Sequence, residues 1–505
     1  MRVPLRPSGP LAATLGAALS LLAGCGGPVD RPRGAVLITL DTTRADVLSC
    51  YGGPAGLTPH LDRLAAEGVR FDRAYTVAPM TLPSHASMLT GLIPPRHTVR
   101  DNGHRALPAS AETVAELAAA AGIQTAAFVS ASVLHQGFGL DQGFDRYDAP
   151  AETQASLGTQ YRSRLAHEVV ADAVAWLAQR DPERGFLLWV HLWDPHAPYD
   201  PPAAFRRDNP YHGEVASADD AAGNLLDALR ADPAWERTAV IVVADHGESF
   251  GEHGEWTHGP FLYESTVRVP LILRAPGLVA GSSEAVVSVT DVAPTLAEAL
   301  RLTMPPDTDG RSLLRPAGLE ARGAWLESLE GSFAYGWAPL WGWVDARGKY
   351  LDGGAPRLFD PLADPGESRD LARGRAAELE GFRQAIRAAA GRPALERGDG
   401  DGVDEELLRA VQELGYAAVG ATEEADGAPV PLAVTGSPDP LDRAEELRQL
   451  SRAGNLANSG ALAEAEALYA EVVAGNPGNL WAQEMLGSLR TLLGQHQRAL
   501  PPLMA

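Results

Sequence analysis

Near-continuous apolar runs alternate with segments of helical period along the first 300 residues. The runs are "AVLITL" (35–40), "QTAAFVSA" (124–131), "FLLWVHLW" (186–193), "AVIVVA" (239–244) and "VPLILRA" (269–275). Such runs are typical of strands in a mainly parallel sheet that is covered on both faces. Helical period marks the segments 59–67, 112–121, 163–179, 216–230 and 291–300. The pattern predicts an α/β fold with a doubly wound sheet, in which ligands bind beyond the carboxyl ends of the strands.

The pattern changes beyond the predicted core, residues 34–300. Residues 301–390 are aromatic and Gly-rich with short alternating stretches, which predicts a small antiparallel C-terminal subdomain. Residues 391–440 are rich in Gly, Pro, Ala and acidic residues, so we expect a linker with a short helix near 403–416.

The last segment, 441–505, has the period of helices. Ala465, Tyr469 and Pro477 fit the small, aromatic and proline positions of a tetratricopeptide-like repeat, which would offer a surface for a protein partner. Two unrelated amphipathic helices are the alternative.

The N-terminus has the features of an export signal. Arg2 and Arg6 precede an apolar run that is short for a membrane span, and residues 1–24 are predicted to be a signal peptide. The run ends in "LAGC", which resembles a bacterial lipobox and implies cleavage before Cys25 and lipidation of its thiol. Residues 25–33 would then be a tether, and the protein would be anchored to a membrane in the cell envelope or periplasm. A plain secretory signal is the alternative.

The formal net charge of −23 narrows the ligand classes. An acidic chain is not expected to bind nucleic acid, because the negatively charged phosphate backbone binds basic surfaces. It also repels anionic substrates at long range, so an anion would need local cations or a metal ion.

Chemically active side chains follow three of the predicted strands. Asp41 comes after the first, Asp245 and His246 come after "AVIVVA", and Asp194 and His196 come after "FLLWVHLW". Because these strand ends meet at one edge of the sheet, we expect a site of oxygen and nitrogen ligands there. Such a set suits a hard or borderline divalent ion.

Several motifs in this order give a family resemblance. Residues 34 to about 385 resemble the sulfatase family of the alkaline phosphatase superfamily in "DTTRADVLSCYG", "TLPSHASMLTGLIPPRHTVRDNG", "DPHAPY", "DHGESFGEHG", "YESTVRVPLILRAPG" and "RLFDPLADPGESRDLA". The resemblance implies an exported, metal-dependent hydrolase of sulfate or phosphate esters. Its substrate would be an anionic ester of a small molecule, a glycan or a lipid.

The nucleophile motif departs from the sulfatase pattern. Sulfatases carry Cys-x-Pro-x-Arg, whose cysteine becomes formylglycine, whereas this chain has Thr81, Leu82, Pro83, Ser84 and His85. The motif is similar to the Thr-x-Pro-x-His nucleophile of nucleotide pyrophosphatase/phosphodiesterases.

Two related groups of enzymes, these phosphodiesterases and the phosphoethanolamine transferases, indicate roles for the remaining residues. Asn102 stands where the phosphodiesterases place the asparagine that holds a phosphoryl oxygen, and His258 stands where phosphoethanolamine transferases place a phosphate contact. Asp41, Thr81, Asp245 and His246 would hold one Zn²⁺, Ca²⁺ or Mn²⁺ ion, with Thr81 as the attacking group. Asn102, His196 and His258 would stabilise substrate charge. We also consider a second metal at Asp194 and His196.

Two alternatives to hydrolysis stay open at this point. The first is a transferase that passes a phosphoryl head group to an alcohol acceptor. The second is a non-catalytic sulfatase-like protein that binds anions and docks a partner through its helical repeat.

Overall fold

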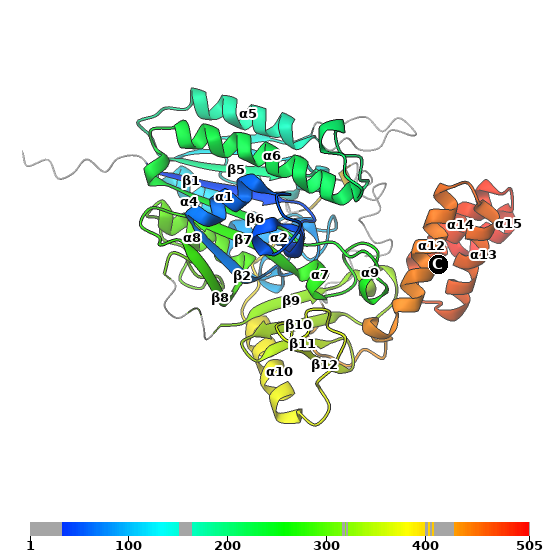
Figure 1. Ribbon diagram of the computed structural model, residues 1–505. Helices are drawn as coiled ribbons and strands as arrows, with labels where there is room; N and C mark the ends of the chain where they lie inside the picture. The colour runs from blue at the N-terminus through cyan, green and yellow to red at the C-terminus, as the bar shows by residue number, and fades with distance from the viewer. Residues whose placement is uncertain are drawn as a thin grey trace, which may run out of the picture. The chain divides into compact units, whose positions relative to one another are not determined.

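The computed structural model describes residues 33–150, 164–315, 319, 322–398, 402–404, 407–408 and 429–503. An eight-stranded sheet forms the core of its first part (Figure 1). The strand order is β4-β3-β5-β1-β6-β7-β2-β8. The strands are β1 (Gly34–Leu40), β2 (Val69–Tyr75), β3 (Gln124–Phe128), β4 (Arg146–Asp148), β5 (Phe186–Leu192), β6 (Thr238–Ala244), β7 (Arg268–Arg274) and β8 (Gly281–Ser288).

All five predicted apolar runs form strands of this sheet, which confirms the mainly parallel α/β prediction. Every residue of β1, β5 and β6 is buried, because helices cover both faces of these central strands. The strand β7 differs from the others, since it runs antiparallel to both of its neighbours, β6 and β2. Sequence pattern missed β2, β4 and β8, where polar residues interrupt the apolar positions or the strand is short.

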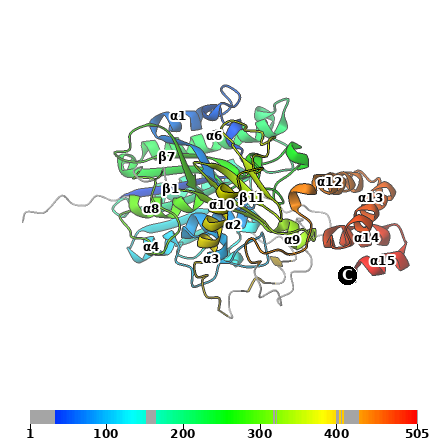
Figure 2. The ribbon, with the colours of Figure 1, turned by 90° about the horizontal axis from the view of Figure 1, so that it is seen from below.

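Two layers of helices sandwich the sheet (Figure 2). One layer contains α1 (Pro59–Glu67), α5 (Ala166–Gln179) and α6 (Pro210–Ala231). The other contains α2 (Thr81–Thr90), α4 (Val114–Ala120) and α8 (Val292–Ala299), and the short α3 (Pro94–His97) follows α2. All five predicted helices are present. The helix α6 begins six residues earlier than predicted, because Pro210 occupies its first turn and the Asn209 side chain accepts a hydrogen bond from Tyr211 N at 3.0 Å.

A second, antiparallel sheet follows the core, as predicted. Its order is β12-β11-β10-β9, with β9 (Ala324–Ser328), β10 (Leu340–Asp345), β11 (Gly348–Asp352) and β12 (Pro356–Phe359). Helices α9 (Glu330–Ala334) and α10 (Ala376–Ala390) accompany it, and α7 (Glu264–Val267) precedes β7 in the core. The start of the expected linker packs on the core, since Leu395 N donates to Arg96 O at 2.8 Å.

The C-terminal segment is helical, in agreement with its sequence pattern. It contains α12 (Ala444–Asn458), α13 (Leu462–Gly475), α14 (Leu480–Leu492) and α15 (His496–Leu503). Ala465 and Tyr469 are buried in the apolar cluster that α12, α13 and α14 share. Their identity as a tetratricopeptide-like unit stays a prediction.

Several sequence predictions lie outside the described residues. They are the signal peptide, the lipidated Cys25, all but the last residue of the tether, and most of the helix expected near 403–416. Within the described ranges, none of the helices has the length and apolar character needed to cross a bilayer.

Candidate active site

The ends of β1 and β6 bring two carboxylates and an imidazole together. The strand β1 pairs with both β5 and β6, and Leu40 lies opposite Leu192 and Ala244 in this register. Asp41 and Asp245, the next residues along, therefore emerge side by side. The His246 Nε2 atom lies 3.6 Å from Asp245 Oδ2 and 3.9 Å from Asp41 Oδ1, and all three side chains are fully buried.

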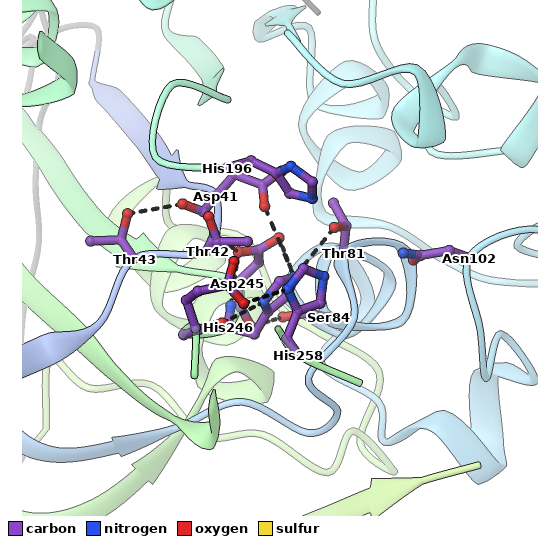
Figure 3. Close-up of polar contacts among 12 residues, drawn as sticks. Asp41, Thr42, Thr43, Thr81, Ser84, Asn102, His196, Asp245, His246 and His258 are labelled. Carbon is purple, nitrogen blue, oxygen red and sulfur yellow. Dashed lines mark hydrogen bonds and ion pairs between the residues drawn. The ribbon is translucent and has the colours of Figure 1, made fainter. Parts of the chain in front are cut away.

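Thr81 reaches this group from the first turn of α2 (Figure 3). Its Oγ1 atom lies 3.4 Å from His246 Nε2. Ser84, one residue beyond Pro83, donates its hydroxyl to Asp245 O at 2.8 Å and so ties the helix to the end of β6. The structure thus brings together the four residues that were predicted to hold a metal ion.

The donor set fits a divalent cation. Asp245 Oδ1 accepts from the backbone N–H groups of Thr42 and His246, at 3.2 and 2.8 Å, but Oδ2 has no hydrogen-bond partner. Both carboxylate oxygens of Asp41 also lack one. An unpartnered buried polar group costs about 1–3 kcal/mol, and a charged one costs more. A cation ligated by these oxygens and by His246 would remove that cost.

Burial also acts on the pKa values of the two acids. It raises the pKa of Asp41 to about 7, and it raises the pKa of Asp245, to which the nearby negative charge of Asp41 adds. Two adjacent buried carboxylates in a protein interior need positive charge to stay ionised. This electrostatic demand supports the same conclusion as the unpartnered oxygens.

Asn102 lies on the other side of the nucleophile motif. Its Oδ1 atom accepts from Leu82 N at 2.8 Å, which leaves the fully buried Nδ2 without a hydrogen-bond partner. The preceding residue, Asp101, fixes this loop by accepting from Gly103 N and His104 N. The amide N–H₂ of Asn102 is therefore available to a ligand oxygen beside Thr81.

The two remaining predicted histidines lie next to each other and to the acid group. The His258 ring lies 4.2 Å from the His246 ring and 5.5 Å from the His196 ring, centroid to centroid. Burial lowers the pKa of His258 to about 4 and that of His196 to about 3, so both are neutral near pH 7. His196 also stacks on Trp193 at 3.7 Å.

Glu248 is a partner of His258 that sequence reasoning did not single out. Its Oε1 atom lies 3.1 Å from His258 Nδ1, and its Oε2 atom accepts from Tyr199 OH at 2.8 Å. This places the proton of the neutral imidazole on Nδ1 and leaves Nε2 as an acceptor. The glutamate follows His246 by two residues in "DHGE", a position on the correct loop that could have signalled the role.

Asp194 is held by hydrogen bonds that join a strand to two helices. This argues against the second metal site considered at Asp194 and His196. Its Oδ2 accepts from Ala166 N at 2.7 Å and its Oδ1 accepts from Ser217 Oγ at 3.0 Å, which joins β5 to α5 and α6. Both oxygens are thus engaged by protein donors. Where the structure describes the chain, the groups of potential metal ligands contain neither Asp194 nor His196.

Two further buried histidines, His85 and His191, lie beside Asp41 and Asp245. We call the position that these two histidines share the inner side of the acid pair. His191 pairs with Thr39 across β5 and β1, so it shares a face of the sheet with Asp41, and its Nε2 lies 3.2 Å from Asp41 Oδ2. His85, on α2, has its Nδ1 atom 3.9 Å from Asp245 Oδ2. A lone histidine inside the apolar run "FLLWVHLW" was the available signal for His191.

Comparisons with known proteins identify the family and agree with the fold. The sequence model of the family described as Sulfatase matches residues 34–302. An arylsulfatase of Clostridium perfringens is 24% identical over 431 residues, covering 66% of this chain and 89% of that protein.

Solved structures resemble the chain in fold. One protein, determined in complex with its substrate D-glucosamine-2-N,6-O-disulfate, has a TM-score of 0.61 at 20% identity, over 72% of this chain and 98% of that one. A phosphonate monoester hydrolase of Agrobacterium radiobacter has a TM-score of 0.57 at 22% identity, over 71% and 96% of the two chains.

Proposed function

This chain belongs to the sulfatase family within the alkaline phosphatase superfamily and is an ester hydrolase, and on that premise we propose that it cleaves sulfate or phosphate esters through a covalent intermediate on Thr81. The observation that carries the proposal is the position of the Thr81 hydroxyl. It lies 3.4 Å from His246 Nε2, beside two buried carboxylates, at the first residue of a helix.

A threonine nucleophile dictates a two-step reaction. A hydrated formylglycine has a second hydroxyl that can expel the bound group, whereas Thr81 has only one. In the first step the Thr81 hydroxyl gives its proton to His258, its oxygen bonds to the sulfur or phosphorus atom, and the bond to the substrate's alcohol oxygen breaks. His258 passes the proton to the departing alcohol. In the second step water attacks the same atom in line, the bond to Thr81 breaks, and the proton that the water loses returns through His258 to the Thr81 oxygen.

The surrounding residues have distinct tasks in this scheme. The amide of Asn102 donates to an equatorial oxygen of the ester, where negative charge develops. The N-terminal end of α2 adds a favourable field for an anion. His258, which Glu248 holds through Nδ1, accepts the proton of the attacking water at Nε2.

We also propose that the reaction depends on a divalent metal. Asp41, Asp245, His246 and Thr81 would hold it, and it would lower the pKa of the Thr81 hydroxyl and neutralise charge on the substrate oxygens. Members of the sulfatase family bind a divalent metal, and the unpartnered oxygens described above support one in this chain.

The cellular context is proposed from the sequence. The N-terminal pattern supports export and lipid anchoring at Cys25, and the sulfated sugar in the related structure supports a sulfated glycan as one substrate class. The helices α12–α15 would dock a protein partner. We expect no nucleic-acid ligand, given the net charge of −23.

A substrate panel tests the proposal. Three preparations are compared: metal-loaded wild-type protein, chelator-treated wild-type protein, and Thr81→Ala protein. Each is assayed with aryl sulfates, aryl phosphates and phosphodiesters, with and without an added alcohol. We expect turnover of at least one class by the metal-loaded protein alone, and its loss in the other two preparations. Equal turnover by Thr81→Ala would contradict the proposal, and an alcohol-linked product would instead indicate a transferase.

A further inference from the structure

The two buried carboxylates of the site lie close to three imidazoles. On the side of Thr81, His246 Nε2 faces Asp41 Oδ1 at 3.9 Å and Asp245 Oδ2 at 3.6 Å. On the inner side, His191 Nε2 faces Asp41 Oδ2 at 3.2 Å, and His85 Nδ1 lies 3.9 Å from Asp245 Oδ2. The reaction proposed above uses only the first side.

The inner group has the composition of a ligand set. His85, His191 and Asp245 are all fully buried, and one potential ligand atom from each lies within 4.8 Å of the others. The rings of His85 and His191 are 5.0 Å apart in an edge-to-face arrangement. Two imidazoles and a carboxylate suit zinc or a similar divalent ion.

The hydrogen bonding of His85 prepares one nitrogen for a ligand. Its Nδ1 donates to Thr81 O at 2.8 Å, which leaves Nε2 as an acceptor, and Nε2 has no hydrogen-bond partner. Ligating histidines commonly fix their other nitrogen in this way, by donating to a backbone carbonyl. Both ring nitrogens of His191 also lack a hydrogen-bond partner, despite full burial.

We propose that His191 and the unpartnered Nε2 of His85 hold a second divalent cation, which shares the carboxylates of Asp41 and Asp245 with the first. Asp41 is placed to bridge, because its Oδ1 faces His246 and its Oδ2 faces His191. Paired ions in such centres lie about 3.5–4 Å apart, a spacing that one bridging carboxylate spans. This centre would be the second metal site of the chain, in place of the one considered at Asp194 and His196.

Metal counting tests the second site without relying on the proposed reaction. The full chain is stripped with a chelator, reloaded with Zn²⁺ or Mn²⁺, dialysed, and its metal content is measured by plasma mass spectrometry. We expect two ions per wild-type chain, and one ion per chain in His191→Asn and in His85→Gln. The matched control is His97→Gln, since His97 is another fully buried histidine, bonded to Ser87 Oγ at 2.9 Å, and outside the cluster.

Electron paramagnetic resonance of the Mn²⁺-loaded protein supplies a second reading. Two adjacent ions would show exchange coupling in the wild type, and His191→Asn would show an uncoupled ion. One ion per wild-type chain would overturn the proposal, even if the variants fold poorly, and would leave His191 as a residue that only orients Asp41. Two ions retained by both variants would also overturn it. Neither result would contradict hydrolysis through Thr81.

Discussion

His97 connects the helix of the nucleophile to the following turn, and its replacement should change how stability depends on pH. The residue ends α3 and is fully buried. Val99 N donates to its Nδ1 at 3.2 Å, so the proton of the neutral ring is on Nε2, which faces Ser87 Oγ on α2 at 2.9 Å. A second proton on Nδ1 would point at the Val99 N–H group. Burial, with a smaller contribution from Arg100, accordingly lowers the pKa of His97 to about 3.

The size of the effect follows from that pKa. The unfolded chain takes up a proton at His97 near the ordinary value of 6.5, whereas the folded protein does so only near pH 3. Because the folded-state pKa is depressed, the wild type loses stability as pH falls below 6.5. Between about pH 6.5 and pH 5.0 the loss is about 2 kcal/mol, at about 1.36 kcal/mol per pH unit.

The assay is urea unfolding of the wild type and His97→Gln at pH 7.5 and at pH 5.0. At the higher pH the variant should be less stable by about 1–3 kcal/mol, since it loses a buried polar contact. At the lower pH this difference should shrink by about 2 kcal/mol, because glutamine does not titrate. Other buried histidines titrate in both proteins and cancel in the comparison. A difference that stays constant across the two pH values would refute the reasoning.

Three further predictions concern the site and its support. Thr81→Ser keeps the hydroxyl and should retain measurable turnover, whereas Thr81→Ala should lose at least about a thousandfold in kcat, and similar rates for the two would contradict a nucleophilic role. Glu327→Ala should destabilise the fold by about 3–5 kcal/mol in urea unfolding, because Arg100, bound at 2.6 and 2.8 Å, would remain buried without its partner. A loss below about 1 kcal/mol would show that water replaces the carboxylate. Glu248→Gln should lower kcat by about 10²-fold with little change in KM, as expected if the carboxylate holds His258 for proton transfer, and an effect on KM alone would argue against it.

The sequence was informative where one physical cause dominates. Burial on both faces makes the central strands continuously apolar, so β1, β5 and β6 are readable, and the residue after each strand falls at the ligand-binding edge. This is why the sequence alone predicts that Asp41 and Asp245 lie together. His246 was found on the same principle, whereas Thr81, which begins α2, was indicated by the motif resemblance.

What the sequence did not show depends on contacts between distant segments. Asp194 has the same local context as the other strand-end acids, and only its bonds to Ala166 N and Ser217 Oγ reveal that it joins helices to the sheet. His191 sits within an apolar run, and its proximity to Asp41 follows from the register between β5 and β1. The sequence also did not show that β7 is antiparallel to its neighbours. An apolar strand is compatible with parallel or antiparallel pairing, and only the pairing of β7 with β6 and β2 shows its direction.

The chemical identity of the Thr81 oxygen in the reaction is open to direct measurement. Metal-loaded protein is mixed with a substrate that the panel identifies, quenched in acid within one turnover, digested, and the peptides are analysed by mass spectrometry. We predict a sulfuryl or phosphoryl group on Thr81, and none in Thr81→Ala protein treated in the same way. Full turnover in the wild type with an unmodified Thr81 peptide at every quench time would contradict the covalent mechanism.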